Sequence, residues 1–541
     1  MPGLIFQNRL SSRTACWIGL GLVLLGTLLL RVRMLDIPLE RDEGDYAYFA
    51  MLMTQGVSPV DEAVRIRFPL ISGLYAFFIT LFGHTAAGVH AGLLVANLAT
   101  TLLLFLIGRK LLGPLAGLVA AACFAVLDVS PTVQGFSANR EQFLILFVAG
   151  GVWMLLKAFD RRRWPLFFLS GVLMGLAFLI KQHGAAFILF GGLYVVAGHV
   201  DLRRRAILLK EMLVRGLAYS VGALLCYGLV CLFYLSLGEF QRFWYRTVVY
   251  PKSYASSLSF AEGSGQLMER LSAIFLASPV IWCLAMLGLT AAFWSGRVRQ
   301  HLPLLVGLAA FSLLSIMPGF YFRPHYFVLI LPAAALLAAC GVESLRGAFK
   351  ARLPAAWGRP VLAILVVLAV ATPIHGQRQY LVESTLFEAY RHTYELNPFW
   401  AAREVGEYLK EQTTPEDRIL ILGSEPEILF YAERMSVTKH VYMYDLMYGT
   451  ETADRIQEEL IAAAERHRPS HVVLVDVSTS WLVRPESSMR VFEWWVEFQK
   501  QYELVAFWKI LPDGPRRVTG ELLESIDEGK PFSIMVFRRV P

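Results

Sequence analysis

Long runs of apolar residues, separated by short charged segments, occupy residues 1–375 of the chain. A helix that crosses about 30 Å of hydrocarbon needs about 20 mostly apolar residues. The pattern therefore predicts a polytopic α-helical membrane protein with about eleven transmembrane helices, at residues 14–35, 86–108, 113–130, 141–159, 164–181, 183–200, 213–237, 272–295, 302–318, 324–345 and 359–375. The apolar segment 68–82 is shorter and has a proline at position 69, which favours a juxtamembrane or re-entrant helix.

The pattern changes after residue 375. Residues Arg418–Leu422 and His471–Val477 form compact apolar runs typical of buried strands, and further strands are expected near 503–508 and 532–538. Residues 400–412 and 453–466 have helical spacing. This alternation predicts a C-terminal α/β domain at residues 376–541, after a transmembrane domain at residues 1–375.

Charge gives the expected orientation. Lysine and arginine residues concentrate in alternate loops, which belong on the cytoplasmic side: Arg109, Lys110, Lys157, 161–163, 203–205, Lys210, Arg297, Arg299, Arg346, Lys350, Arg352 and Arg359. With eleven spans, the N-terminus is then cytoplasmic and the C-terminal domain extracytoplasmic, in a multi-pass protein of the cell membrane. The net charge of +7 reflects these loops and does not indicate a nucleic-acid partner. The six cysteines all lie in apolar runs, so no disulfide framework or metal site is predicted.

The densest acidic segment of the membrane part lies just after the first predicted span. Of the 16 acidic residues before position 376, five lie in residues 36–45, including Asp42, Glu43 and Asp45. The following residues, 46–53, suit a helix that lies along the membrane surface. A carboxylate that is partly desolvated there becomes more basic and suits deprotonation of a hydroxyl group. The alternative is a solvated acidic loop.

Polar residues also mark other outward loops. Arg140 and Glu141 precede the fourth span, where they orient a sugar or begin a helix whose dipole favours the acid. Lys181 and His183 form a tight turn, in which the lysine binds an anion or extends to the headgroups.

Ahead of the tenth span stand Arg323, His325 and Tyr326, whose donors suit a phosphate. The aromatic side chains there also suit an interfacial belt. The loop 238–271 carries Trp244, Tyr245, Arg246, Tyr250, Lys252 and Tyr254, which suit a carbohydrate, a lipid or the membrane interface.

Several of these motifs, in this order and on one side of the membrane, resemble those of the integral-membrane GT-C glycosyltransferases. The resemblance is to the branch of protein O-mannosyltransferases and aminoarabinose transferases, and it covers most of residues 14–345. It rests on the Asp42-Glu43 pair, the Arg67-Phe-Pro-Leu segment, the Lys181 turn and the run from Arg323 to Pro332. Arg41 and Asp45, which flank the acidic pair, depart from the family pattern, so the choice of base among residues 42–45 stays open.

The resemblance implies transfer of a sugar from a polyprenyl-phosphate carrier to a hydroxyl group of a glycan, lipid or protein acceptor, outside the membrane, as part of glycosylation at the cell envelope. Asp42 would be the base, assisted by Glu43. We expect Asp45, Arg140, Glu141, Lys181, His183, Arg323, His325 and Tyr326 to bind substrate.

We expect an inverting displacement. Asp45 or Glu141 leaves a retaining route open, because that route needs a second carboxylate about 5 Å away. No DxD pattern occurs in the acidic loop, so no cofactor or essential metal is expected. The alternatives are a membrane transporter or flippase of a lipid-linked or anionic substrate, and a non-enzymatic receptor. A transporter usually has ionisable groups near the bilayer midplane and an internal repeat, and neither is found in this sequence.

Overall fold

The computed structural model describes residues 2–57, 68–198, 200–201, 206–249, 260–519 and 532–540. These residues pack as two compact units. The helical unit comprises Met1–Met34, Arg67–Leu70 and Gly92–Ser384, and the mixed unit comprises Leu35–Ile66, Ile71–Ala91 and Thr385–Pro541. The packing thus joins two N-terminal segments to the C-terminal residues. The predicted domain boundaries, 1–375 and 376–541, stay a prediction.

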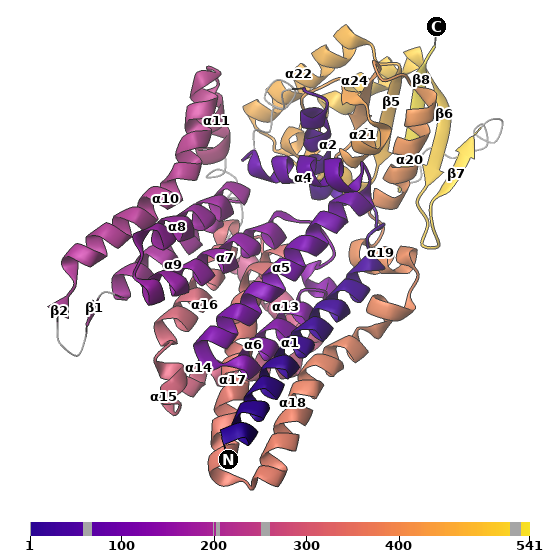
Figure 1. The fold of residues 1–541 in the computed structure, drawn as a ribbon. Helices are drawn as coiled ribbons and strands as arrows, with labels where there is room; N and C mark the ends of the chain where they lie inside the picture. Colours follow the sequence, from indigo (N-terminus) through magenta and orange to yellow (C-terminus); the bar gives the residue numbers. More distant parts are fainter. Residues whose placement is uncertain are drawn as a thin grey trace. The chain divides into compact units, whose positions relative to one another are not determined.

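The helical unit consists almost entirely of helices (Figure 1). They are α1 (Pro2–Val32), most of α5 (Ala86–Leu112), α6 (Pro114–Leu127), α7 (Arg140–Arg161), α8 (Trp164–Ile180), α9 (Gly184–Ala197), α10 (Leu209–Ser236), α11 (Phe240–Trp244), α13 (Phe260–Ala277), α14 (Pro279–Thr290), α15 (Gly296–Arg299), α16 (Leu302–Ile316), α17 (Leu331–Arg352) and α18 (Ala355–Gly376). Short helical turns η1 to η6 lie between or beside them, at Pro131–Val133, Tyr245–Val249, Ala291–Phe293, Pro318–Phe320, Pro324–Ile330 and Gln379–Glu383. Two strands of two residues each, β1 (Val200–Asp201) and β2 (Ala206–Ile207), pair antiparallel before α10.

Glycines allow close contacts between helices in this unit. A Cβ atom at Gly171 of α8 would lie 2.0 Å from the carbonyl oxygen of Tyr219 in α10. A Cβ atom at Gly288 of α14 would lie 1.8 Å from the carbonyl oxygen of Leu337 in α17. Small residues let apolar helices approach this closely, which is a common way to pack helices in a membrane.

The chain is a multi-pass membrane protein, and the predicted spans coincide with its apolar helices except for 272–295, which crosses the break between α13 and α14. In the described part of the chain, six helices are long and apolar enough to cross a membrane, or up to seven if one bent pair is a single span. That pair is Ala261–Ala277 with Pro279–Phe293, bent by 105°. Five other apolar helices are shorter, among them Leu70–Phe82, so the count of about eleven spans stays a prediction.

The mixed unit contains a six-stranded sheet that packs with helices (Figure 1). Its helices are α2 (Arg41–Thr54), α4 (Leu70–Phe82), the first turn of α5, α19 (Leu386–Tyr394), α20 (Phe399–Gln412), α21 (Glu427–Ala432), α22 (Glu451–His467), α23 (Ser478–Trp481) and α24 (Arg490–Phe498), with the turns η7 (Met443–Met447) and η8 (Gln499–Gln501). Its strands are β3 (Arg418–Leu422), β4 (Met435–Ser436), β5 (His471–Asp476), β6 (Tyr502–Lys509), β7 (Arg516–Thr519) and β8 (Ser533–Arg539).

The sheet has the order β4-β3-β5-β8-β6-β7. Strand β3 pairs in parallel with β4 and β5, with Leu420 opposite Val472. Strands β5, β8, β6 and β7 pair antiparallel in that order. The predicted α/β fold is confirmed, and the four predicted strands lie at β3, β5, β6 and β8.

One predicted helix differs in its surroundings. Residues 46–53 were expected to lie along a membrane surface, but they belong to α2, which begins at Arg41 and packs on α21. Residues 43–52 are all buried, and Tyr46 contacts Tyr75 of α4 edge-to-face at 5.6 Å. The aromatic side chains of α2 are therefore part of a protein core.

Candidate functional site

The acidic segment forms the N-terminus of α2. Glu40 is the N-cap, and its carboxylate accepts hydrogen bonds from the backbone amides of Asp42 at 3.1 Å and Glu43 at 3.3 Å. The Glu43 carboxylate accepts a hydrogen bond from the Glu40 amide at 3.0 Å, which completes a capping box. The density of acids thus has a structural cause, since carboxylates stabilise a helix N-terminus.

Glu43 is fully buried, and its carboxylate makes hydrogen bonds to other residues of the mixed unit. Its Oε1 lies 2.9 Å from His90 Nε2, while His90 Nδ1 donates to the Leu35 carbonyl at 2.8 Å. Because Nδ1 must carry a hydrogen, one further proton lies between Nε2 and the Glu43 carboxylate. An acceptor cannot reach this carboxylate, so the geometry favours a positioning role for Glu43 over a role as base.

Asp42 differs from the other two acids in its exposure. Asp45 is fully buried, like Glu43, whereas Asp42 is only partly buried. Asp42 Oδ1 accepts a hydrogen bond of 3.0 Å from the hydroxyl of Tyr442. Of the three candidate carboxylates, Asp42 is therefore the one that a substrate hydroxyl group could approach.

Arg41 fastens this helix start to the turn after β3. Its Nε donates to the Ser424 carbonyl at 2.7 Å, and its guanidinium pairs with Glu425 at 2.6 Å. The fully buried Glu425 also accepts a 2.5 Å hydrogen bond from Ser480. The Arg41 guanidinium lies over the ring of Tyr444 at 5.4 Å. Arg41, a departure from the family pattern, thus holds the acidic helix through charge-assisted hydrogen bonds.

A second contact brings α2 and α21 together at Gly44. A Cβ atom there would lie 2.6 Å from Cβ and 2.7 Å from the backbone nitrogen of Glu427. The Glu427 carboxylate is fully buried, and neither oxygen has a hydrogen-bond partner among the described residues. Burial, reinforced by the charge of Glu425, raises the pKa of Glu427 well above its ordinary value. Burial and the charges of Asp42 and Glu43 raise the pKa of Glu40 in the same way.

A cationic cluster lies in the helical unit. Lys181, at the end of α8, forms an ion pair with Glu141 in the first turn of α7, and both side chains are buried. The Lys181 ammonium lies 3.8 Å from the ring centroid of Tyr326. Because the Lys181 side chain is only 6% exposed, it does not extend to the headgroups.

Two histidines and an arginine complete this cluster. The rings of His183 and His325 each contact Tyr326 edge-to-face at 5.0 Å, and His325 Nδ1 lies 3.1 Å from Gln134 Oε1. Arg140 and His325 act electrostatically on Glu141. The structure thus brings together six of the predicted residues: Arg140, Glu141, Lys181, His183, His325 and Tyr326. Basic groups outnumber the acid, which suits an anion.

Arg323 is placed differently from Lys181. Its side chain is exposed, and its guanidinium lies 5.9 Å from the Tyr321 ring. In the loop 238–271, Trp244 and Tyr245 are exposed. Arg246 belongs to η2, a π-helical turn. The other predicted residues of that loop lie outside the described part of the chain: Tyr250, Lys252 and Tyr254.

Sequence reasoning missed a buried polar network in the helical unit. Arg31 pairs with Asp128 at 2.6 Å and donates to the Gly135 carbonyl at 2.9 Å. Asn97 donates to Asp128 at 2.8 Å and to Gln142 at 2.9 Å. A lone acid inside the apolar run 113–130 was the available signal, because such a charge requires a partner. His90 and Tyr442 were also missed, since nothing local marks them.

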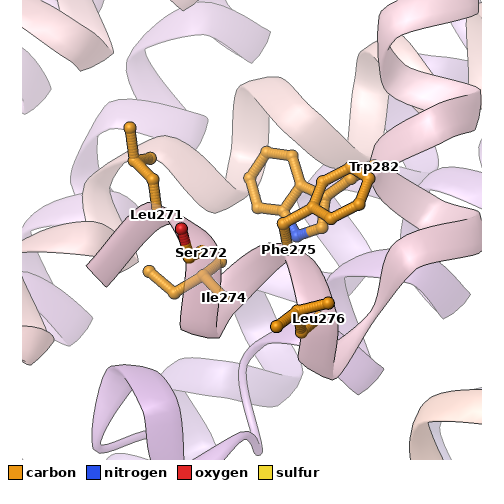
Figure 2. Close-up of a pocket in the computed structure, with 6 residues that line it drawn as sticks. All are labelled: Leu271, Ser272, Ile274, Phe275, Leu276 and Trp282. Atoms are coloured by element: carbon orange, nitrogen blue, oxygen red, sulfur yellow. The ribbon is translucent and has the colours of Figure 1, made fainter. Parts of the chain in front are cut away.

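An apolar pocket lies at the bend between α13 and α14 (Figure 2). Its lining comes from Leu271, Ser272, Ile274, Phe275, Leu276 and Trp282. No charged side chain lines it, so it does not suit a phosphate. Among the described residues, no group of three or more His, Cys, Asp or Glu side chains is arranged to hold a metal ion.

The fold is that of integral-membrane glycosyltransferases of the GT-C type, which confirms the predicted fold class. The structure of ArnT from Cupriavidus metallidurans bound to undecaprenyl phosphate matches with a TM-score of 0.55 and 15% sequence identity, over 97% of this chain and 98% of ArnT. The archaeal oligosaccharyltransferase AglB from Archaeoglobus fulgidus, in complex with an inhibitory peptide and a dolichol-phosphate, matches with a TM-score of 0.50 and 13% identity, over 96% and 75% of the two chains.

The family comparison agrees with the structural one. Residues 67–234 match the family model of dolichyl-phosphate-mannose-protein mannosyltransferases. A search of curated proteins gave no match. A second structure of the Archaeoglobus fulgidus oligosaccharyltransferase, tethered with an acceptor peptide, matches with a TM-score of 0.52 and 12% identity, over 95% and 75% of the two chains. The predicted resemblance is confirmed, and these matches indicate a glycosyltransferase.

Proposed function

We propose that the protein is an inverting glycosyltransferase that moves a sugar from a polyprenyl-phosphate carrier to an acceptor hydroxyl group outside the membrane. The partly buried residue Asp42 carries this proposal, because the other two candidate acids, Glu43 and Asp45, are fully buried. Two structures with the same fold, those of ArnT and AglB, contain polyprenyl phosphates, which supports a lipid-linked donor.

The proposed reaction is one displacement at the anomeric carbon. Asp42 takes the proton of the acceptor hydroxyl group, whose oxygen forms the new bond to the anomeric carbon. The bond between that carbon and the phosphate oxygen breaks, and the phosphate leaves with the electron pair. Lys181, with Arg140 and the two histidines of the cluster, stabilises the charge on the leaving phosphate. Arg323 is proposed as a second phosphate ligand because its exposed guanidinium suits bidentate contact.

Both chemical tasks are assigned to side chains of this chain, so no resident metal enters the proposal. Transfer should therefore persist after divalent ions are chelated, provided that the protein stays folded.

The same proposal puts the N-terminus in the cytoplasm and the predicted C-terminal domain, residues 376–541, outside, on the basis of the lysine and arginine bias of the loops. A transporter or flippase is less consistent with the family match over residues 67–234 and with a carboxylate whose surroundings suit a base.

The test is transfer of radiolabelled sugar from a polyprenyl-phosphate donor by the purified protein in lipid. Asp42→Asn should lower the transfer rate by about 10²–10⁴ while donor binding survives. Glu43→Gln should cause a smaller loss, since His90 and the Glu40 amide still hold its side chain. Normal turnover by Asp42→Asn would refute the assignment of the base. A wild-type protein that flips the carrier without transferring its sugar would support the transporter alternative.

A further inference from the structure

We propose that Tyr442, in the segment between β4 and η7, is a positioning residue for Asp42. This inference rests on the proposed function and extends the site to residues that follow the transmembrane helices. Tyr442 is 3% exposed, and its hydroxyl lies 3.0 Å from Asp42 Oδ1 and 2.8 Å from the Arg41 carbonyl oxygen. The hydroxyl therefore contacts the proposed base and the backbone of the preceding residue.

The geometry allows the hydroxyl to serve both protonation states of the base. A tyrosine hydroxyl has one proton to donate and can also accept. When Asp42 is a carboxylate, the hydroxyl donates to Oδ1 and fixes the orientation of the acid. After Asp42 has taken a proton from the acceptor, the carboxylic acid can donate to the same hydroxyl, whose own proton turns to the Arg41 carbonyl. The hydrogen bond thus persists through the proton transfer.

The surrounding contacts hold Tyr442 in this position. The backbone amide of Met443 donates to the Ser424 hydroxyl at 2.8 Å, and the Ser424 carbonyl accepts from Arg41. The Tyr442 ring contacts Tyr444 edge-to-face at 5.7 Å, and the Arg41 guanidinium lies over Tyr444. These contacts close a ring from α2 through the turn after β3 to residues 442–444 and back to Asp42. Each contact lies within the mixed unit, so the ring belongs to one compact body.

Other ionisable groups surround the same helix start. Glu40 and Glu43 face it from α2, His90 faces Glu43 from α5, and Glu425 and Glu427 approach from the turn after β3. The Tyr442 hydroxyl makes a hydrogen bond of 3.0 Å to the Asp42 carboxylate. Tyr442→Phe removes this hydrogen bond and leaves the charges around the helix start unchanged.

The experiment measures sugar transfer against pH, together with donor binding, for Tyr442→Phe in the full chain. We expect kcat to fall about tenfold, with donor affinity unchanged and the acid limb of the kcat profile moved to higher pH. Loss of a hydrogen bond to the charged form disfavours that form, so a given fraction of active enzyme requires a higher pH.

Tyr48→Phe is the matched control. The Tyr48 hydroxyl also joins α2 to the β4 region, where it accepts a hydrogen bond of 2.9 Å from the backbone amide of Ser436. Tyr48→Phe tests the cost of losing one buried hydroxyl, and its pH profile should match that of the wild type. A Tyr442→Phe variant with the wild-type kcat and pH profile would overturn the inference. So would equal changes in both variants, because they would indicate a structural role. Inactivity of the wild-type protein would instead overturn the proposed function.

Discussion

Replacing the buried cation of the helical unit tests the proposed phosphate site. Lys181→Met alone is ambiguous, because it leaves Glu141 buried without the ammonium that it pairs with. Breaking a buried ion pair from one side costs about 3–5 kcal/mol of stability. A fall in donor binding could then follow from local unfolding.

The double variant Lys181→Met with Glu141→Gln removes both charges together. Replacement of a whole buried pair is often nearly neutral for stability, so most of the lost free energy of unfolding should return. If Lys181 contacts the donor phosphate, affinity should stay low, because a hydrogen bond to a charged group contributes about 1.5–3 kcal/mol. This corresponds to roughly a ten- to hundredfold rise in donor Kd.

Thermal unfolding in detergent and binding of a labelled polyprenyl phosphate measure the two effects separately. The exposed ion pair of Lys110 with Asp160, in the same unit, supplies the control. Lys110→Met with Asp160→Asn should change neither quantity by much, since exposed pairs contribute about 0–1 kcal/mol. A folded Lys181 double variant with wild-type donor affinity would refute the assignment of this cluster to the phosphate.

Three further predictions concern packing, protonation and orientation. Gly44→Ala should destabilise the mixed unit and lower transfer. Adding Glu427→Ala should not restore stability or transfer, because the clash is with the Cβ and backbone nitrogen at position 427, which alanine keeps. Recovery in the double variant would contradict this. The raised pKa of Glu427 means that the folded state keeps a proton that the unfolded state loses as pH rises above about 4.5. Stability should therefore fall with rising pH, and it should depend less on pH in Glu427→Gln. Unfolding midpoints of both proteins across pH 5–8 would measure this, and parallel pH curves for the wild type and the variant would rule it out. A cysteine introduced at position 205 should react with an impermeant reagent only from the cytoplasmic side, and labelling from outside the cell would reverse the proposed orientation.

The sequence predicted the elements whose cause is local. Apolar length marked the helices of the helical unit, and compact apolar runs marked β3, β5, β6 and β8. It also selected residues that the structure brings together, since Glu141, Lys181 and Tyr326 come from three different helical segments. Their shared feature was a polar residue at the end of an apolar run, where a charge without a function would be costly.

The surroundings of Asp42 could not be predicted in this way. Tyr442 is 400 positions away in sequence, and the turn that holds Arg41 lies more than 380 positions away. No periodicity links such residues, because only the tertiary fold brings them together. The aromatic stripe of α2 was misinterpreted for the same reason. An apolar helix face suits a membrane surface and a protein core equally well. In this protein the face belongs to a core, because α2 packs on α21.

These contacts change what removal of the C-terminal segment should do. A C-terminal segment that only guided acceptors or stabilised the membrane part would, when deleted, lower activity or stability without changing donor specificity. The mixed unit, however, includes Leu35–Ile66 and Ile71–Ala91, and residues 424–442 supply the partners of Arg41 and Asp42. A chain that ends at residue 384 keeps Lys181 and its cluster but loses Glu425, Ser424 and Tyr442.

We therefore expect that shortened chain to retain donor binding within about tenfold, because each charge-assisted contact of the cluster, at about 1.5–3 kcal/mol, is kept. Transfer should fall by at least as much as in Asp42→Asn, about 10²–10⁴, since α2 loses both its clamp and the packing of Gly44 on Glu427. Donor binding and transfer by the two proteins in the same lipid separate these effects. Near-normal transfer by the shortened chain would show that α2 holds its conformation without the C-terminal segment, and catalysis by the isolated segment would place the base elsewhere.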